Sequence, residues 1–280
     1  MFKRQTEGSV ICTSCGVLVG VNDATCYNCQ RRNPGLWGYA PAFRSLGQDL
    51  GFVRLVMGGT VALYLLSLLL SGASLRPMLA PSQQALILLG ASGSVPVFAL
   101  GHWWTVLTAG WLHGGLLHIA FNLYWIRLLA PGVAELYGPG RMVIIYTMAG
   151  IVGFTFSSVA GRFLGGLPLI GGGQMTVGAS APIFGLLGAL VYYGKRTGSR
   201  HVGQTGVQYA IFMGIFGLIA SGIDNQAHLG GFVGGYLASQ LLDPLKSERI
   251  DHLVMAVVCL AATAVAIVVS IVTALPLLMR

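Results

Sequence analysis

The sequence has 280 residues, of which 55% are hydrophobic and 9% are charged, and its formal net charge is +8. So few charges exclude a soluble enzyme with an ordinary charged surface, and the high hydrophobicity excludes a disordered chain. The basic residues lie scattered in short segments without an aromatic-flanked basic stripe, so we expect no nucleic-acid partner. The composition predicts an integral membrane protein in contact with the lipid bilayer.

Residues 1–33 differ from the rest because they carry four of the five cysteines. Cys12 and Cys15 form one Cys-x-x-Cys pair, and Cys26 and Cys29 form a second after ten intervening residues. Four thiolates on two tight turns suit a tetrahedral zinc ion with no open position, which predicts a structural Zn site in a zinc-ribbon-like module. Two disulfides or a redox pair are the alternatives, and a cytoplasmic location disfavours them.

Seven apolar stretches follow a linker at 34–51, and each is near the roughly 20 residues that cross a bilayer. The segment at 75–110, between the first two stretches, contains two adjacent tryptophans and is expected to be an ordered loop at the membrane interface. The fold class is therefore an all-α polytopic membrane protein. The predicted spans are 52–71, 111–130, 142–161, 178–194, 206–223, 226–242 and 253–275.

The distribution of Lys and Arg predicts the orientation of these spans. If the N-terminus is cytoplasmic, 13 of these residues face the cytoplasm and 3 face the other side. We therefore expect a multi-pass protein of a bacterial cytoplasmic (inner) membrane with its N-terminus in the cytoplasm and its C-terminus outside. The pair 206–223 and 226–242 could instead be one broken helix, and the last span would then run the other way.

Polar side chains inside predicted spans are expensive and are therefore functional candidates. The second span carries His113, His118 and Asn122, and the last two lie four residues apart on one helical face. Ser180 follows a glycine-rich stretch and is expected at a helix N-terminus, since Pro182 suits the first helical turn. Backbone N–H groups converge there and suit an oxyanion beside an attacking serine. The alternative is that Ser180 only caps the helix.

The sixth span carries His228 near its start. Two glycine pairs follow, Gly230 with Gly234 and Gly231 with Gly235, and each forms a small-xxx-small face. A helix this bare can lie almost against its neighbour, so His228 could reach a serine on the helix alongside. The alternative is a histidine whose hydrogen bond is made to a backbone carbonyl.

Four segments together carry a specific resemblance: WWTVLTAGWLH at 103–113, HIAFN at 118–122, GAS at 178–180 and AHLGG at 227–231. In order and spacing they resemble the rhomboid family of intramembrane serine proteases. The resemblance implies a rhomboid-like six-helix core at 52–242. We expect a loop and a seventh transmembrane helix at 243–280.

The resemblance also implies a catalytic role for each matched residue. Ser180 would be the nucleophile, and His228 would be the general base and then the acid that protonates the leaving amine. His118, Asn122 and the Ser180 backbone N–H would stabilise the oxyanion. A carboxylate partner is not needed in this family, and catalysis needs no cofactor.

Three further residues would support this dyad. The resemblance gives His113 a structural, hydrogen-bonding role and places the Phe184 ring on the dyad histidine. Gly231 would let the sixth span pack closely on the fourth. The implied function is an intramembrane serine endopeptidase that cleaves single-span transmembrane proteins near the outer face. The zinc module would serve an unidentified cytoplasmic partner.

Two departures from the family pattern keep an alternative open. Ala181 stands where the family usually has glycine, and its methyl group would crowd two helices. Thr105 stands where the family usually has an arginine that orders the long first loop. A catalytically inactive rhomboid-like protein that binds membrane clients is the first alternative. A transporter is the second, although the spans show no two-half repeat.

Overall fold

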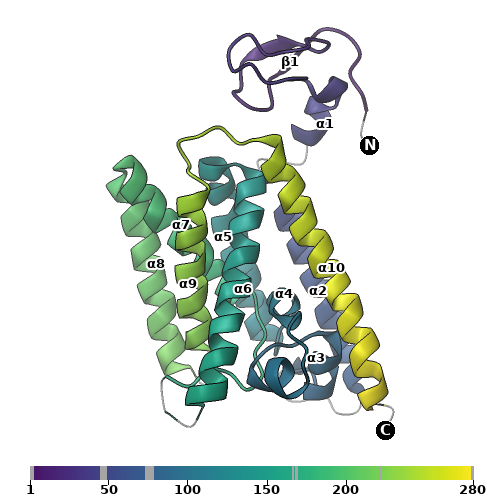
Figure 1. Ribbon diagram of the computed structural model, residues 1–280, viewed down its shortest axis with the longest axis vertical. Coiled ribbons are helices and arrows are strands. Elements are labelled where there is room, and N and C mark those ends of the chain that lie inside the picture. Colours follow the sequence, from purple (N-terminus) through teal and green to yellow (C-terminus); the bar gives the residue numbers. More distant parts are fainter. Residues whose placement is uncertain are drawn as a thin grey trace.

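The computed structural model describes residues 3–44, 49–72, 79–165, 167, 170–220 and 222–278. A bundle of long helices forms most of the molecule, and a small N-terminal module lies beyond one end of it (Figure 1). We call that end of the bundle the module end and the opposite end the distal end.

The N-terminal module is built around a two-stranded antiparallel sheet in which Val10 pairs with Val19. These valines pack with the buried side chains of Cys12 and Cys26. A core this small needs a further source of stability, such as a bound metal. The module's elements are β1 (Ser9–Ile11), β2 (Leu18–Gly20), the 3-10 turn η1 (Leu36–Gly38) and α1 (Ala40–Arg44).

In the part of the chain that the structure describes, seven long helices form the bundle, one for each predicted span. The second, α5, begins later than predicted, so His113 lies in the loop before it and not within a span. The two spans at 206–223 and 226–242 are separate helices, which excludes one broken helix (Figure 1). The seven are α2 (Phe52–Ser71), α5 (Leu116–Tyr137), α6 (Pro139–Leu164), α7 (Ser180–Thr197), α8 (Arg200–Ile219), α9 (Asn225–Leu241) and α10 (Ile250–Leu278).

Two of the seven helices are less apolar than the others. Within the described ranges, α2, α5, α6, α8 and α10 are long and apolar enough to cross a membrane. Helix α7 carries Lys195 and Arg196 in its last turn, which lower its mean hydropathy, and α9 has only 17 residues. Residues 181–190 of α7 are nevertheless all buried. Because protein and not lipid surrounds this helix, it does not need a continuous apolar surface.

The segment between α2 and α5 is an ordered loop, as predicted, although its residues 75–78 lie outside the described part. Thr105 does not disorder it. The Thr105 side chain is buried, and its Oγ1 donates a hydrogen bond to the His102 carbonyl at 2.7 Å. Trp104 Nε1 donates to Ser270 Oγ of α10 at 3.0 Å. The loop contains α3 (Gln83–Leu89), η4 (Val95–Ala99), α4 (Thr105–Thr108) and η5 (Ala109–Trp111).

Helix α9 packs at backbone distance against two neighbours. A Cβ atom added to Gly231 or Gly235 would collide with the backbone of α7, at Ala181 and Gly185. A Cβ atom on Gly234 would lie 2.7 Å from the Val152 side chain of α6. Both predicted small-residue faces are therefore occupied, one by α7 and the other by α6.

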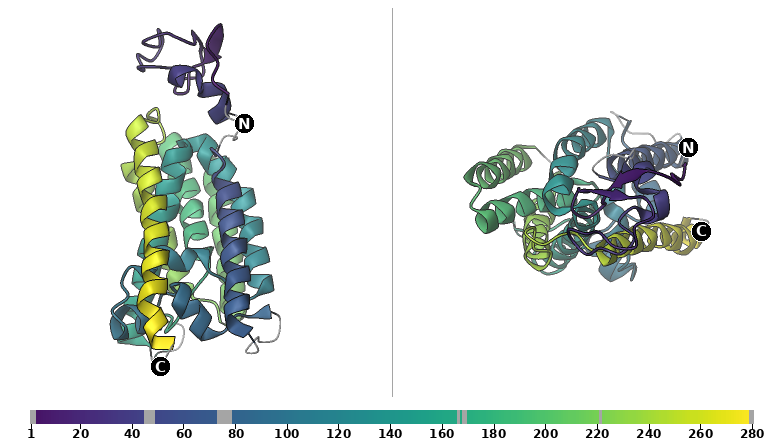
Figure 2. Two further views of the ribbon diagram at one scale, coloured as in Figure 1. Left: turned by 90° about the vertical axis from the view of Figure 1, so that its right-hand side faces the viewer. Right: turned by 90° about the horizontal axis from the view of Figure 1, so that it is seen from above.

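At the module end of the bundle, hydrogen bonds in both directions join the start of α6 to the connection between α9 and α10. Glu248, in the connection before α10, accepts a hydrogen bond from the Arg141 backbone N–H at 2.9 Å, at the start of α6. Arg141 Nη1 donates to the carbonyl oxygens of Asp243 and Lys246, both at 2.8 Å. Burial raises the pKa of Glu248 above its usual range. These contacts fix α10 beside the core, where it runs to the distal end (Figure 2).

Because α9 packs so closely on α7, adding a single methyl group between them should strongly destabilise the fold. Gly235→Ala should lower the free energy of unfolding by about 1–3 kcal/mol, because the methyl must displace the Gly185 backbone. Gly214→Ala is the matched control, since a Cβ atom there meets nothing within 4 Å. Thermal unfolding in detergent micelles measures both. Equal melting temperatures for the two variants would contradict the packing described here.

Candidate active site and cysteine cluster

Ser180 is the first residue of α7 and is partly exposed. Ala179 occupies the N-cap position, and no side chain caps this helix. The interpretation of Ser180 as only a capping residue is therefore wrong. Its backbone N–H lies in the first helical turn, where N–H groups have no intrahelical acceptor and can stabilise an anion.

His228 lies in the first turn-and-a-half of α9, and its imidazole stacks on the Phe184 ring of α7. The ring centroids are 4.3 Å apart and the planes differ by 15°. Phe184 is one helical turn after Ser180 and shares its face. The sixth predicted span therefore presents its histidine to the face of the fourth that carries the serine.

The His228 side chain is available for chemistry. It is 7% exposed, and its Nδ1 has no hydrogen-bond partner within the described residues. A backbone carbonyl does not hold this nitrogen, so the simple structural interpretation of His228 is not supported. Gly231 lies one turn further along α9 against Ala181, which brings the two helix starts together.

His118 and Asn122 of α5 face the backbone just before Ser180. A Cβ atom on Gly178, whose φ is +129°, would lie 2.6 Å from His118 Nε2 and 3.7 Å from Asn122 Nδ2. The Gly114 backbone N–H donates to His118 Nδ1 at 3.3 Å. An accepting Nδ1 leaves the proton of a neutral imidazole on Nε2, which then is a donor directed at the serine loop.

His113 supports this loop from the other side. Its ring is fully buried, and Nε2 accepts a hydrogen bond from the Ala179 backbone N–H at 3.4 Å. It also meets the His118 ring edge-to-face at 5.0 Å. His113 thus contacts both the residue before Ser180 and the neighbouring donor, although it lies outside the helix in which it was predicted.

The methyl group of Ala181 does not push α9 away. It is buried beside Gly153 of α6, where an added Cβ atom would lie 2.9 Å from the Ala181 Cβ. The missing side chain of Gly153 therefore accommodates the methyl group that distinguishes this chain from the usual pattern. α9 can still approach the Ala181 backbone through Gly231.

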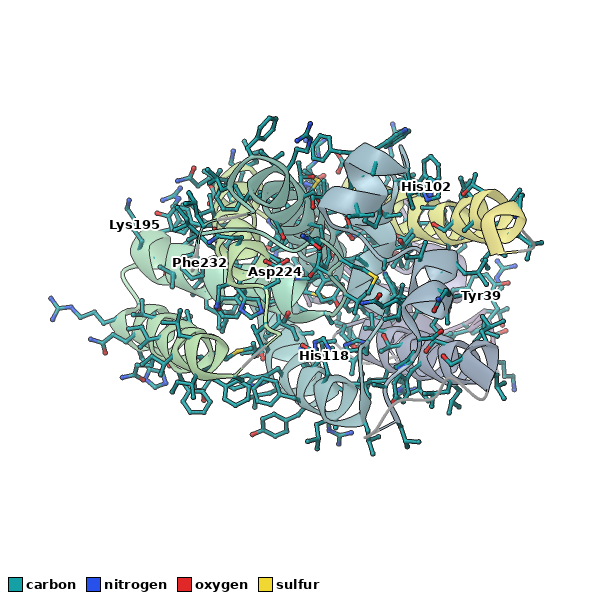
Figure 3. The ribbon with its side chains drawn as sticks, turned by 90° about the horizontal axis from the view of Figure 1, so that it is seen from below. Tyr39, His102, His118, Lys195, Asp224 and Phe232 are labelled. Atoms are coloured by element: carbon teal, nitrogen blue, oxygen red, sulfur yellow. The ribbon has the colours of Figure 1, made fainter. Side chains whose placement is uncertain are left out.

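Asp224 and Ser157 were not among the residues predicted to form the site. Asp224 Oδ1 accepts a hydrogen bond from the Ala227 backbone N–H at 3.0 Å, and Asp224 Oδ2 accepts a short one from Ser157 Oγ of α6. Asp224 and His118 both lie near the middle of the distal end (Figure 3). An Asp four residues before the histidine, at a helix start, was the signal for Asp224. No sequence signal pointed to Ser157.

The four cysteines of the module form one cluster. Their sulfur atoms all lie within 4.8 Å of one another, with Cys12 to Cys29 at 3.8 Å and Cys15 to Cys26 at 3.6 Å. All four are free thiols, so the disulfide alternative is wrong. The geometry and the donor set fit a metal ion.

The thiols of this cluster differ in pKa when no metal is bound. A hydrogen bond from the Val17 backbone N–H lowers the pKa of Cys15 to about 6, whereas burial raises the pKa of Cys29 to about 11. Metal binding requires thiolates and therefore releases the remaining protons.

The sequence was compared with known proteins and protein families. The model of the rhomboid domain matches residues 100–244, which is more than half of the chain. The chain belongs to the rhomboid family. The match includes the serine loop, the α5 donors and the α9 histidine. It stops before α10.

Relatives of this rhomboid chain include proteins named as proteases and a protein named as inactive. Rhomboid protease GluP of Bacillus subtilis is 34% identical over 185 residues, which cover 65% of this chain and 34% of GluP. YdcA of the same organism is 32% identical over 155 residues, which cover 54% of this chain and 73% of YdcA. Inactive RHOMBOID-like protein 8 of Arabidopsis thaliana is 30% identical over 163 residues, which cover 56% of this chain and 43% of that protein. This chain therefore spans about a third of the length of GluP.

The cysteine cluster predicts a bound metal. The purified full chain should contain about one transition-metal ion, as expected for a four-cysteine site. Cys12→Ser should lose it, and Cys259→Ser should retain it because Cys259 lies in α10 away from the cluster. Elemental analysis by mass spectrometry measures the metal. A folded, metal-free parent protein would contradict the prediction.

Proposed function

We propose that this chain is an intramembrane serine endopeptidase that cleaves single-span transmembrane proteins by a Ser180–His228 dyad. The observation that carries the proposal is the stacking of His228 on Phe184, one turn after Ser180 on a helix start. A lone serine at a helix start has many structural roles. A serine, a histidine whose Nδ1 has no partner and two donor side chains beside the serine loop suit acyl transfer.

The chemistry follows from this arrangement. His228 takes the proton of Ser180 Oγ as the oxygen attacks the scissile carbonyl carbon, which gives a tetrahedral oxyanion. The Nε2–H of His118, the Nδ2–H of Asn122 and the Ser180 backbone N–H stabilise the negative charge. His228 then protonates the amine as the C–N bond breaks. Water attacks the acyl-enzyme with His228 as base, and the carboxylate product leaves with Ser180 regenerated.

The membrane orientation and the metal complete the proposal. The 13-to-3 distribution of basic residues supports a cytoplasmic location for the module end, in a bacterial inner membrane. Cleavage then takes place near the outer face, where Ser180 begins α7. The cluster of Cys12, Cys15, Cys26 and Cys29 holds a structural zinc ion, and the module at 1–33 binds a cytoplasmic partner. The linker is 34–51, the six-span core 52–242, and the seventh span follows in 243–280.

An inactive client-binding protein is the alternative function. The two sequence departures that favoured it have compensating structure, because Gly153 accommodates the Ala181 methyl group and Thr105 is hydrogen-bonded within an ordered loop. Both dyad residues are retained. These observations favour the protease.

The protease proposal predicts a graded loss of activity. Against a panel of tagged single-span substrates in proteoliposomes, Ser180→Ala and His228→Ala should abolish cleavage. His118→Ala and Asn122→Ala should each lower kcat by about 10²–10³-fold, because each removes an oxyanion donor.

Two matched variants control for the substitutions. Ser239→Ala removes a serine hydroxyl bonded to the Gly235 carbonyl, and His201→Ala removes an exposed histidine of α8. Both should retain cleavage. If Ser180→Ala cleaves like the parent, or if the parent cleaves no substrate and no fluorophosphonate labels it, the protease assignment is wrong.

A further inference from the structure

Asp224 differs from the other acidic residues in its position in the fold. The chain has eight acidic residues, all within the described ranges, and the other seven belong to the N-terminal module or to the module end of the bundle. Asp224 alone lies at the distal end, one helical turn before His228 (Figure 3). A charged side chain at the depth of the membrane costs free energy, so such residues usually have partners and a functional role.

Both carboxylate oxygens of Asp224 are fixed. One accepts the Ala227 backbone N–H at 3.0 Å, which caps α9, and the other accepts the Ser157 hydroxyl of α6. Ser157 Oγ in turn accepts the Gly173 backbone N–H at 3.0 Å. The Gly173 carbonyl accepts the backbone N–H of Ser94 at 2.9 Å.

This chain of contacts joins four of the segments around the dyad. It runs from the start of the histidine helix, through α6, into the glycine-rich loop that leads to Ser180, and on to the ordered loop between α2 and α5. A Cβ atom on Gly173 would lie 2.8 Å from Asp224 Oδ2, so the loop passes directly over the carboxylate. The position of Asp224 therefore determines how the two halves of the dyad approach.

The carboxylate also acts on His228 electrostatically. Two titratable side chains interact with the His228 ring, the Asp224 carboxylate and the His118 imidazole. When Ser180 transfers its proton, the ring becomes an imidazolium inside a poorly solvated site, where charge–charge interactions are strong. A fixed negative charge one turn away favours that cation over the neutral ring, and it needs no reorganisation when the proton moves.

We propose that Asp224 is a positioning residue of the dyad, which holds the start of α9 against α6 and the serine loop and stabilises the imidazolium form of His228 by its negative charge. The inference rests on the proposed protease function. It adds a carboxylate to a mechanism for which the family resemblance implied a serine and a histidine alone.

A purely structural role for Asp224 makes a different prediction. Asn caps helices as well as Asp does and retains an acceptor oxygen for Ala227. If capping were the whole role, Asp224→Asn would restore full function. If the charge matters, Asp224→Asn would remain impaired while the fold is intact.

The test measures kcat, KM and the rate of Ser180 labelling by a fluorophosphonate, with the full chain in proteoliposomes. Asp224→Asn should lower kcat and the labelling rate about tenfold, because the imidazolium loses a charged partner. KM should stay within about twofold and the melting temperature within about 2 °C, since the cap and the substrate contacts remain. Asp49→Asn is the matched control, because Asp49 lies at the module end and its carboxylate likewise accepts a backbone N–H of a first helical turn, from Val53 of α2 at 2.7 Å. It should behave as the parent.

The outcomes distinguish a failure of the Asp224 inference from a failure of the proposed protease function. If the parent labels and Asp224→Asn labels and cleaves at the same rate, the inference fails and the protease function stands. If Ser180 of the parent does not label and no substrate is cleaved, both fail. If Asp224→Asn does not fold, Ser157→Ala decides, because it frees the carboxylate but keeps its charge and its cap. A kcat equal to that of the parent would then overturn the positioning role of the Ser157–Asp224 contact, and a lower kcat with unchanged KM would support it.

Discussion

The contact on which the rest of the structure depends is the packing of α9 on α7 at backbone distance. Gly231 and Gly235 leave no room for a side chain against Ala181 and Gly185, so the two helices approach far more closely than side-chain packing allows. His228 lies at the start of one helix and Ser180 at the start of the other. This contact brings the two helix starts together, and the stacking on Phe184 sets the angle of the imidazole.

The same contact lies in the interior of the bundle. Residues 181–190 of α7 are all buried, so the surrounding helices separate this part of α7 from lipid. A polar site can then exist at membrane depth because protein groups, and not hydrocarbon, surround it. The donors of α5, the Ala179 N–H held by His113 and the carboxylate of Asp224 all lie in this protein-lined region.

The number of long helices, the helix start at Ser180 and the cysteine cluster could be predicted from the sequence, because each depends on local spacing. The start of α5 could not, since Gly114 and Gly115 interrupt an otherwise apolar stretch and leave His113 outside the helix. The space that Gly153 provides for Ala181 lies on another helix. The bond between Ser157 and Asp224 joins residues 67 positions apart. Such contacts depend on the three-dimensional packing, which hydrophobic periodicity does not specify.

The most direct test of the account is an experimental structure of the full chain after reaction with a fluorophosphonate. We expect the phosphorus on Ser180 Oγ, its phosphoryl oxygen within hydrogen-bond distance of His118 Nε2, Asn122 Nδ2 and the Ser180 backbone N–H, and His228 still stacked on Phe184. Such a structure would show the nucleophile, the base and the oxyanion donors in one place. An adduct on another residue, or a Ser180 adduct whose oxygen faces away from His118 and Asn122, would contradict the account.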